Sequence, residues 1–130
     1  MIAADTSALI AVVLGEPEAE RFLAALEADA VTISAASLAE GMIVVEARQG
    51  PDASRDLDLL VAGVVDRITP VDEAHARAAI GAWRRFGKGR HPAGLNFGDC
   101  FAYALARTSG EALLFKGREF THTGISVATF

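Results

Sequence analysis

The sequence predicts an α/β fold, a three-layer α/β/α domain built on a central, mainly parallel sheet of four to five strands. Short apolar runs that suit buried strands alternate along the chain with segments of helical periodicity. Such alternation favours parallel pairing through right-handed crossovers, which place helices on both faces of a sheet. A length of 130 residues and a hydrophobic content of 52% suit a single domain over residues 1–130.

The strands are expected where short apolar runs lack helical periodicity. In chain order these runs lie at residues 2–4, 30–33, 64–69 and 112–115, with a possible edge strand at 125–128. The first run ends at Asp5, so this strand is expected to deliver an acid to one edge of the sheet.

The helices are expected where apolar residues recur at three- and four-residue spacing and where capping or breaking residues mark the ends. The first three are expected from a cap at Thr6 or Ser7 to Leu14 before Gly15, from Pro17 to about Ala28, and from 34–37 through Glu40 to Ala47. The other three are expected from Ala53 to Ala62 after Gly50-Pro51, from a cap at Asp72 to Phe86, and from Asn96 to Gly110. In the fifth helix Ala76, Ala79, Ile80 and Trp83 are expected to face inward.

The last helix is almost wholly apolar from Cys100 to Ala106, and it carries one acid, Asp99, at its start. A helix without a polar face is covered on nearly all sides, so Asp99 is expected at the edge of the core. Asn96 suits the N-cap. Stabilisation of the helix start, through the free N–H groups and the dipole there, is an equally good role for Asp99.

Three acids share this kind of placement, because Asp5 follows a strand and Glu40 and Asp99 begin helices. Sites in parallel sheets collect beyond the C-terminal ends of the strands, where the turn holding Glu119 also follows the fourth strand. We expect these four carboxylates to face one crevice. Clustered carboxylates suit a hard divalent cation such as Mg²⁺, which can activate a water molecule for attack on a phosphodiester.

The charges of the chain are unevenly distributed. The stretch from Arg84 to His91 carries +4 and the remainder −9, which together give the net charge of −5. A basic strip on an acidic protein suits a phosphate-bearing substrate, although a solvated helix end and loop is the alternative. No run is long enough for a membrane span, and the lone Cys100 in an apolar run fits a buried thiol in the reducing cytoplasm.

Five motifs resemble the PIN-domain ribonuclease toxins of the VapC family. They are DTSAL at 5–9, SLAE at 37–40, KGRHPA at 88–93, LNFGDC at 95–100 and LLFKG at 113–117. The resemblance spans nearly the whole chain. It implies a PIN-like domain and an endoribonuclease that uses Mg²⁺ or Mn²⁺, is blocked by a cognate antitoxin and forms a homodimer.

The same resemblance assigns the site residues. It makes Asp5, Glu40 and Asp99 the metal ligands, which with Glu119 form the catalytic set. Ser7 matches a hydroxyl beside the first acid, where it either holds a ligand or caps the helix, and Asn96 matches a residue near the pocket. The residues expected to bind RNA are then Ser7, Asn96, Arg84, Arg85, Lys88 and Arg90.

The chain departs from the family pattern after the fourth strand. Arg118 and Gly124 stand where members commonly carry polar or acidic residues, so only Glu119 keeps an acid there. This departure motivates an alternative, a catalytically weak PIN domain that serves mainly as a binding partner. A small α/β phosphatase or phosphate-binding module is the second alternative, although the chain has no Gly-rich phosphate loop.

The first helix carries more apolar residues than one buried stripe requires, at Leu9, Ile10, Val12, Val13 and Leu14. We therefore expect an antitoxin helix to lie across the first helices and to place a basic side chain in the crevice that the four carboxylates are expected to face. Part of this surface is equally suited to a homodimer contact.

Overall fold

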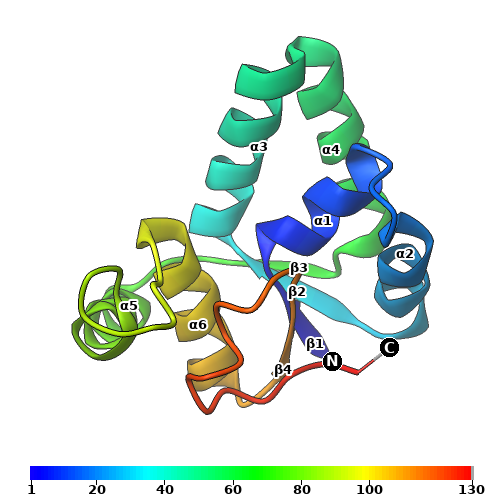
Figure 1. The fold of residues 1–130 in the computed structure, drawn as a ribbon. Helices are drawn as coiled ribbons and strands as arrows, with labels where there is room; N and C mark the ends of the chain where they lie inside the picture. The colour runs from blue at the N-terminus through cyan, green and yellow to red at the C-terminus, as the bar shows by residue number, and fades with distance from the viewer. Residues whose placement is uncertain (130) are drawn as a thin grey trace.

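The structure, a computed structural model, describes residues 1–129. In chain order its elements are β1 (Ile2–Ala4), α1 (Thr6–Val13), α2 (Ala19–Ala28), β2 (Val31–Ser34), α3 (Ala35–Gln49), α4 (Pro51–Val64), β3 (Arg67–Thr69), α5 (Glu73–Phe86), α6 (Phe97–Ser109) and β4 (Ala112–Leu114). Helices flank a central sheet, and α3 and α4 project together beyond it as a hairpin (Figure 1).

The sheet is parallel throughout, with the strand order β3-β2-β1-β4. Ala3 pairs with Leu113 and Ala4 with Leu114, and neighbouring residues of a strand face opposite sides of a sheet. Ala3 and Leu113 accordingly belong to one buried cluster with α5 and α6, whereas Ala4 and Leu114 belong to a second with α1, α2 and α4. This division confirms the expected three layers.

The possible edge strand at 125–128 is the part of the expected sheet that the structure does not bear out. This segment forms an isolated bridge between Val127 and Leu113. Leu113 donates its N–H to the Ser126 carbonyl and accepts from the Ala128 N–H, at 2.8 and 2.9 Å. The segment therefore touches β4 at one residue, too briefly to form a strand of its own.

Several expected helix caps are confirmed, and one is wrong. Asp72 accepts from the His75 N–H at 2.9 Å, and Gly110 ends α6 in the left-handed conformation with φ 75°. The cap of α1 is Asp5, whereas Thr6 or Ser7 was expected. Asp5, which directly follows β1, takes this role because its carboxylate accepts a hydrogen bond from the Ser7 N–H in the first turn.

The other differences concern element lengths. Two helices begin elsewhere than expected. Pro17 lies in a turn before α2, which begins at Ala19, and α4 begins at Pro51 where Ala53 was expected. The helix α4 also extends to Val64, which shortens the third strand to Arg67–Thr69. No helix among residues 1–129 has both the length and the apolar character needed to span a membrane.

The two long helices α5 and α6 pack against each other, and α6 is buried as expected from Ala102 to Ala106. The inward orientation expected for Ile80 and Trp83 is wrong, since they are 45% and 46% exposed. Ala79, Ala82 and Phe86 fill the contact with α6 instead. The apolar residues of α5 cover more of its circumference than α6 can bury.

Candidate functional site

A polar hollow of about 460 Å³ lies at the C-terminal edge of the sheet. It brings together the four acids singled out in the sequence, each from a separate part of the fold. Asp5 directly follows β1, Glu40 lies in α3, Asp99 lies in the first turn of α6 and Glu119 follows β4. We call this hollow the acid pocket.

Asp5 is the most buried of the four acids, with 4% of its surface exposed. Its Oδ2 accepts from the Ser7 N–H at 3.0 Å and so caps α1. Its Oδ1 is buried and has no hydrogen-bond partner among residues 1–129. An unpaired buried carboxylate oxygen is costly, so this atom is the one most in need of a ligand.

Glu40 is held between two elements. Its Oε1 accepts from the Thr6 hydroxyl at 3.1 Å, and its carboxylate lies against Gly98 of α6. A Cβ at position 98 would coincide with that carboxylate. The absence of a side chain at Gly98 therefore gives Glu40 its place beside Asp99.

Asp99 serves the helix start and the acid pocket together. Its Oδ2 accepts from the Asn96 N–H at 3.0 Å, while its own N–H donates to Asn96 Oδ1 at 2.8 Å. This reciprocal capping box confirms Asn96 as the cap of α6. The capping role expected as an alternative for Asp99 thus coexists with its place in the acid pocket.

Glu119 lines the acid pocket despite its exposed side chain. Its carboxylate folds back over Gly117, whose φ of 114° and missing Cβ allow this close approach. Arg118 is exposed and is not among the lining residues. The acid kept at position 119 therefore lies at the same hollow as the other three, and its role as a fourth carboxylate stays a prediction.

Ser7 connects Asp5 to the strand at the other side of the acid pocket. Besides the Ser7 N–H bond to Asp5, the Ser7 hydroxyl oxygen accepts from the Lys116 N–H at 2.9 Å. The Lys116 ammonium pairs with Glu16 at 3.1 Å and with Glu18 at 3.3 Å. Lys116 thus joins the loop after α1 to the end of β4 at the rim of the acid pocket.

Burial and mutual repulsion raise the pKa of two acids. Burial raises the pKa of Asp5 to about 6, with smaller contributions from Glu40 and Glu119 and an opposing one from the Ser7 hydrogen bonds. Burial also raises the pKa of Asp99 to about 6, and the charges of Asp5, Glu119 and Glu40 add to it. The protein groups around the acid pocket therefore supply too little positive charge to offset the burial and repulsion of these two carboxylates.

The donor set of the acid pocket suits a hard divalent cation, because carboxylate oxygens are the ligands that Mg²⁺ and Mn²⁺ prefer. The unpaired Oδ1 of Asp5 fits such a ligand. Within residues 1–129, no three of the His, Cys, Asp and Glu side chains are grouped so that they could hold one ion. The donor set thus fits one or two direct carboxylates, and joint ligation by Asp5, Glu40 and Asp99 stays a prediction.

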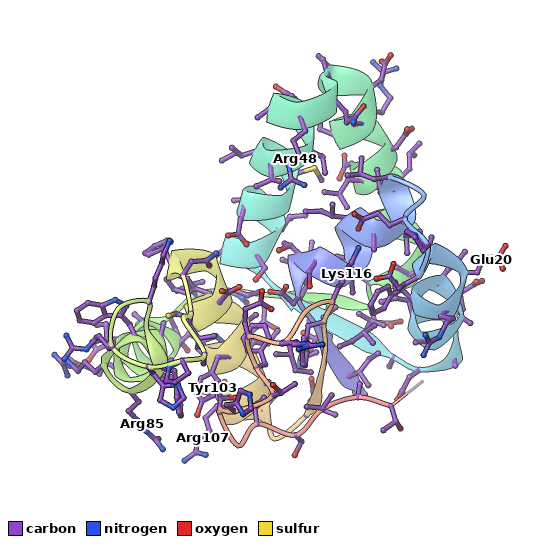
Figure 2. All side chains as sticks on the ribbon, in the orientation of Figure 1. Glu20, Arg48, Arg85, Tyr103, Arg107 and Lys116 are labelled. Carbon is purple, nitrogen blue, oxygen red and sulfur yellow. The ribbon has the colours of Figure 1, made fainter. Side chains whose placement is uncertain are left out.

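The basic residues expected to bind RNA lie outside the acid pocket. Arg84 and Arg85 occupy the last turn of α5, and Lys88 and Arg90 follow in the next loop. All four are exposed, and Lys88 lines a neighbouring apolar groove. Figure 2 shows Arg85 on the α5 side of the molecule, far from Lys116.

The acid pocket contains cations that the sequence analysis missed, Lys116 and Arg48. Lys116 follows the last strand directly, so the rule that sites collect at strand ends already pointed to it. Arg48 lies two helical turns after Glu40, with Val44 between them, and all three line the acid pocket. Helical spacing was therefore the available signal for Arg48.

Comparisons with known proteins agree on one family. The PIN domain matches residues 2–125 of this chain. The chain is 51% identical to a protein named ribonuclease VapC30 from Mycobacterium tuberculosis over 123 residues, which are 94% of each chain.

Solved structures share the fold at lower identity. The crystal structure of VapC20 from Mycobacterium tuberculosis, described as a sarcin-ricin loop cleaving toxin, superposes with a TM-score of 0.80 at 21% identity over 100% of both chains. A toxin–antitoxin complex from Klebsiella pneumoniae gives 0.71 at 19% identity over 100% of this chain and 98% of the other.

The raised pKa of Asp5 predicts a pH-dependent stability of the metal-free protein. Between about pH 4 and pH 6 the folded state keeps a proton that the unfolded chain has released, so the free energy of unfolding falls as pH rises. Asp5→Asn retains a capping oxygen and should stabilise the protein at pH 7.5 by up to about 3 kcal/mol, with little effect near pH 4. Urea denaturation in chelator measures this difference.

Asp58→Asn on the exposed side of α4 is the matched control and should change stability little at either pH. An Asp5→Asn effect of equal size at both pH values would contradict the assignment of the raised pKa to Asp5.

The packing of Glu40 on Gly98 predicts a second result. Gly98→Ala should displace the Glu40 carboxylate while leaving the fold intact, since the side chain can move and alanine favours a helix by up to about 1 kcal/mol. Calorimetric titration should then show Mn²⁺ bound several-fold more weakly. Gly63→Ala, a helical glycine with nothing within 4 Å of its Cβ position, is the control. Equal Mn²⁺ affinities of Gly98→Ala and the parent would disprove a role for this contact.

Proposed function

This chain belongs to the PIN-domain family and, within it, to the VapC ribonucleases, and from this membership we propose a toxin that cleaves RNA internally with a divalent cation, Mg²⁺ or Mn²⁺, at the acid pocket. One observation carries the proposal. Asp5, Glu40, Asp99 and Glu119 come from four elements to one hollow, and a buried oxygen of Asp5 lacks a partner there.

Each acid has a proposed role that its surroundings support. Asp5 and Asp99 are the direct ligands, since burial and repulsion raise the pKa of both and a cation would relieve this cost. Glu40, fixed by Thr6 and Gly98, joins them in binding the same cation through a water molecule, and the more exposed Glu119 orients a further water molecule at this site. When bound, the cation supplies charge neutralisation for phosphate oxygens and a lowered pKa for a water molecule.

The remaining predicted site residues act around these acids. Ser7 holds Asp5 in position through the two hydrogen bonds that connect Asp5, Ser7 and Lys116. Asn96 lines the acid pocket and the neighbouring groove, so it stands where RNA passes between them. The cations Arg84, Arg85, Lys88 and Arg90 contact RNA phosphates outside the acid pocket.

The identity to VapC ribonucleases favours an active enzyme over the two alternatives. Glu119, the acid kept beside the departures at Arg118 and Gly124, lines the acid pocket, which weighs against a weak, binding-only PIN domain. The family gives no support to a phosphatase. The sarcin-ricin loop cleaving toxin is 21% identical to this chain, so its similarity supports the architecture alone. We therefore propose RNA as the substrate class and name no target RNA.

We further propose that residues 1–130 act as one domain in the cytoplasm, where the buried thiol of Cys100 stays reduced. A homodimer is the proposed assembly. The molar mass in solution, measured by light scattering, tests the homodimer.

A cognate antitoxin is the proposed partner, as in the toxin–antitoxin complex that shares this fold. Partial exposure supports the surface proposed for it, since Leu9 is buried but Ile10, Val12, Val13 and Leu14 are half-buried. Ile10 also lines the acid pocket. An antitoxin helix lying on α1 would therefore bring a basic side chain close to the four carboxylates.

The role of Asp99 is tested by Asp99→Asn. The variant should lose RNA cleavage by roughly 100-fold or more, because a neutral amide is a poor ligand for a hard cation. The amide oxygen can still accept from the Asn96 N–H, so the fold should be retained. Cleavage with Mn²⁺, alongside circular dichroism, measures both effects. Cleavage at the parent rate would refute the assignment.

The antitoxin proposal predicts competition between inhibitor and metal. A basic side chain in the acid pocket and a cation neutralise the same carboxylates, so added Mn²⁺ should restore cleavage by a preformed complex. The control is an antitoxin whose arginines are replaced, which should inhibit less. If added metal never restores cleavage and both antitoxins inhibit equally, the inhibitor blocks the surface without occupying the acid pocket.

A further inference from the structure

A second hollow lies beside the acid pocket, between α5 and α6. Its volume is about 550 Å³, and its lining is mainly apolar, with Ile80, Trp83, Phe97 and Phe101 among its residues. Asn96 lines both hollows, so the two adjoin at the start of α6. We call the second hollow the aromatic groove.

The aromatic groove presents an unusually exposed ring. Phe97 is 80% exposed although it begins a helix that is buried from Ala102 to Ala106, and it stands two residues before Asp99. Its ring contacts Phe101 edge-on, with centroids 4.9 Å apart, which supports the ring from one side. The ring of Phe97 is thus held in place while most of its surface faces solvent.

The charges around the aromatic groove are positive. Between Glu73 and Asp99 the chain has five Lys and Arg residues and no acid, and only Arg77 among them pairs with a carboxylate, that of Glu73. Lys88 lines the groove, and the Arg90 guanidinium lies over the Trp83 ring at 4.6 Å from its centroid. The groove therefore combines exposed rings with cations.

These features favour single-stranded RNA over a second copy of this chain as the occupant. A symmetric contact between two such grooves would place the same cations against each other, which is unfavourable. Single-stranded RNA offers unpaired bases for rings and phosphates for cations. Because Asn96 lines both hollows, a strand in the aromatic groove would also lie beside the proposed cleavage site.

We propose that the aromatic groove is a base-binding subsite for single-stranded RNA next to the scissile phosphate, with Phe97 as its stacking surface and Lys88 and Arg90 as its phosphate contacts. This inference rests on the proposed ribonuclease function. It assigns a preference for unpaired nucleotides to α5 and α6 and leaves the chemical step to the acid pocket. Duplex RNA binds more weakly, because its bases are stacked within the helix.

The test measures affinity for a single-stranded 12-nucleotide RNA in an Asp99→Asn background, which prevents cleavage. Phe97→Ala and Phe97→Leu should each weaken binding roughly tenfold, whereas Phe97→Tyr should bind as the parent does. The loss should disappear with a 12-mer whose sugars carry no bases. Leu59→Ala, which truncates a side chain that is 66% exposed on α4, is the matched control.

Three further measurements complete the experiment. Trp83 is the only tryptophan of the chain, so its fluorescence should change when the base-containing 12-mer binds and much less with the abasic one. Replacing Lys88 and Arg90 by alanine should flatten the dependence of affinity on salt by about one to two released counterions. The denaturation midpoint of Phe97→Ala should match the parent, since the ring is exposed.

The outcomes separate the two proposals. If the parent cleaves RNA and the Phe97→Ala variant binds the 12-mer as tightly as the protein that keeps Phe97, the subsite is disproved and the ribonuclease function stands. If Phe97→Ala lowers the molar mass from dimer to monomer and weakens both 12-mers equally, the groove is an interface between copies and the inference is wrong. If the parent never cleaves but Phe97-dependent binding is present, the subsite stands and the proposed function fails.

Discussion

The repulsion between carboxylates gathered at one sheet edge is the constraint on which the rest of this structure depends. Asp5 and Asp99 are buried enough that their pKa values rise to about 6, and Asp5 keeps an unpaired oxygen. The fold must hold these groups together without a cation as well as with one. It does so by giving each acid a local partner: the Ser7 N–H for Asp5, the Thr6 hydroxyl for Glu40 and the Asn96 N–H for Asp99.

The parallel sheet makes that gathering possible with few residues. Every strand points its C-terminal end toward the same edge, so residues distant in the chain meet there without long loops. Gly98 then allows α3 and α6 to bring Glu40 beside Asp99, since any side chain at that position would occupy the carboxylate's space. Helix starts contribute as well, because free N–H groups there favour ionised oxygens.

In the proposed function, two adjoining hollows divide RNA recognition from the chemical step. The acid pocket presents carboxylates with Lys116 and Arg48 at its margin, whereas the aromatic groove presents rings with Lys88 beside them. Asn96 belongs to both. A polyanion that lay only in the acid pocket would be repelled by the carboxylates wherever no cation lay between them. Contacts in a separate cationic groove therefore make its binding to an acidic protein favourable.

The sequence by itself determined the alternating elements, the caps at Asp72 and Asn96, and the three acids at strand or helix ends, because caps and periodicity act over a few residues. Only the tertiary structure decided which cations face the acids. Arg84 and Arg85 form the densest basic run but lie away from the acid pocket, while the isolated Lys116 and Arg48 line it. It also decided that Ile80 and Trp83 face a groove, whereas Ala79 fills the core as expected. The rotation of α5 against α6 and the path of the loop after β4 depend on contacts between distant residues, which local pattern does not encode.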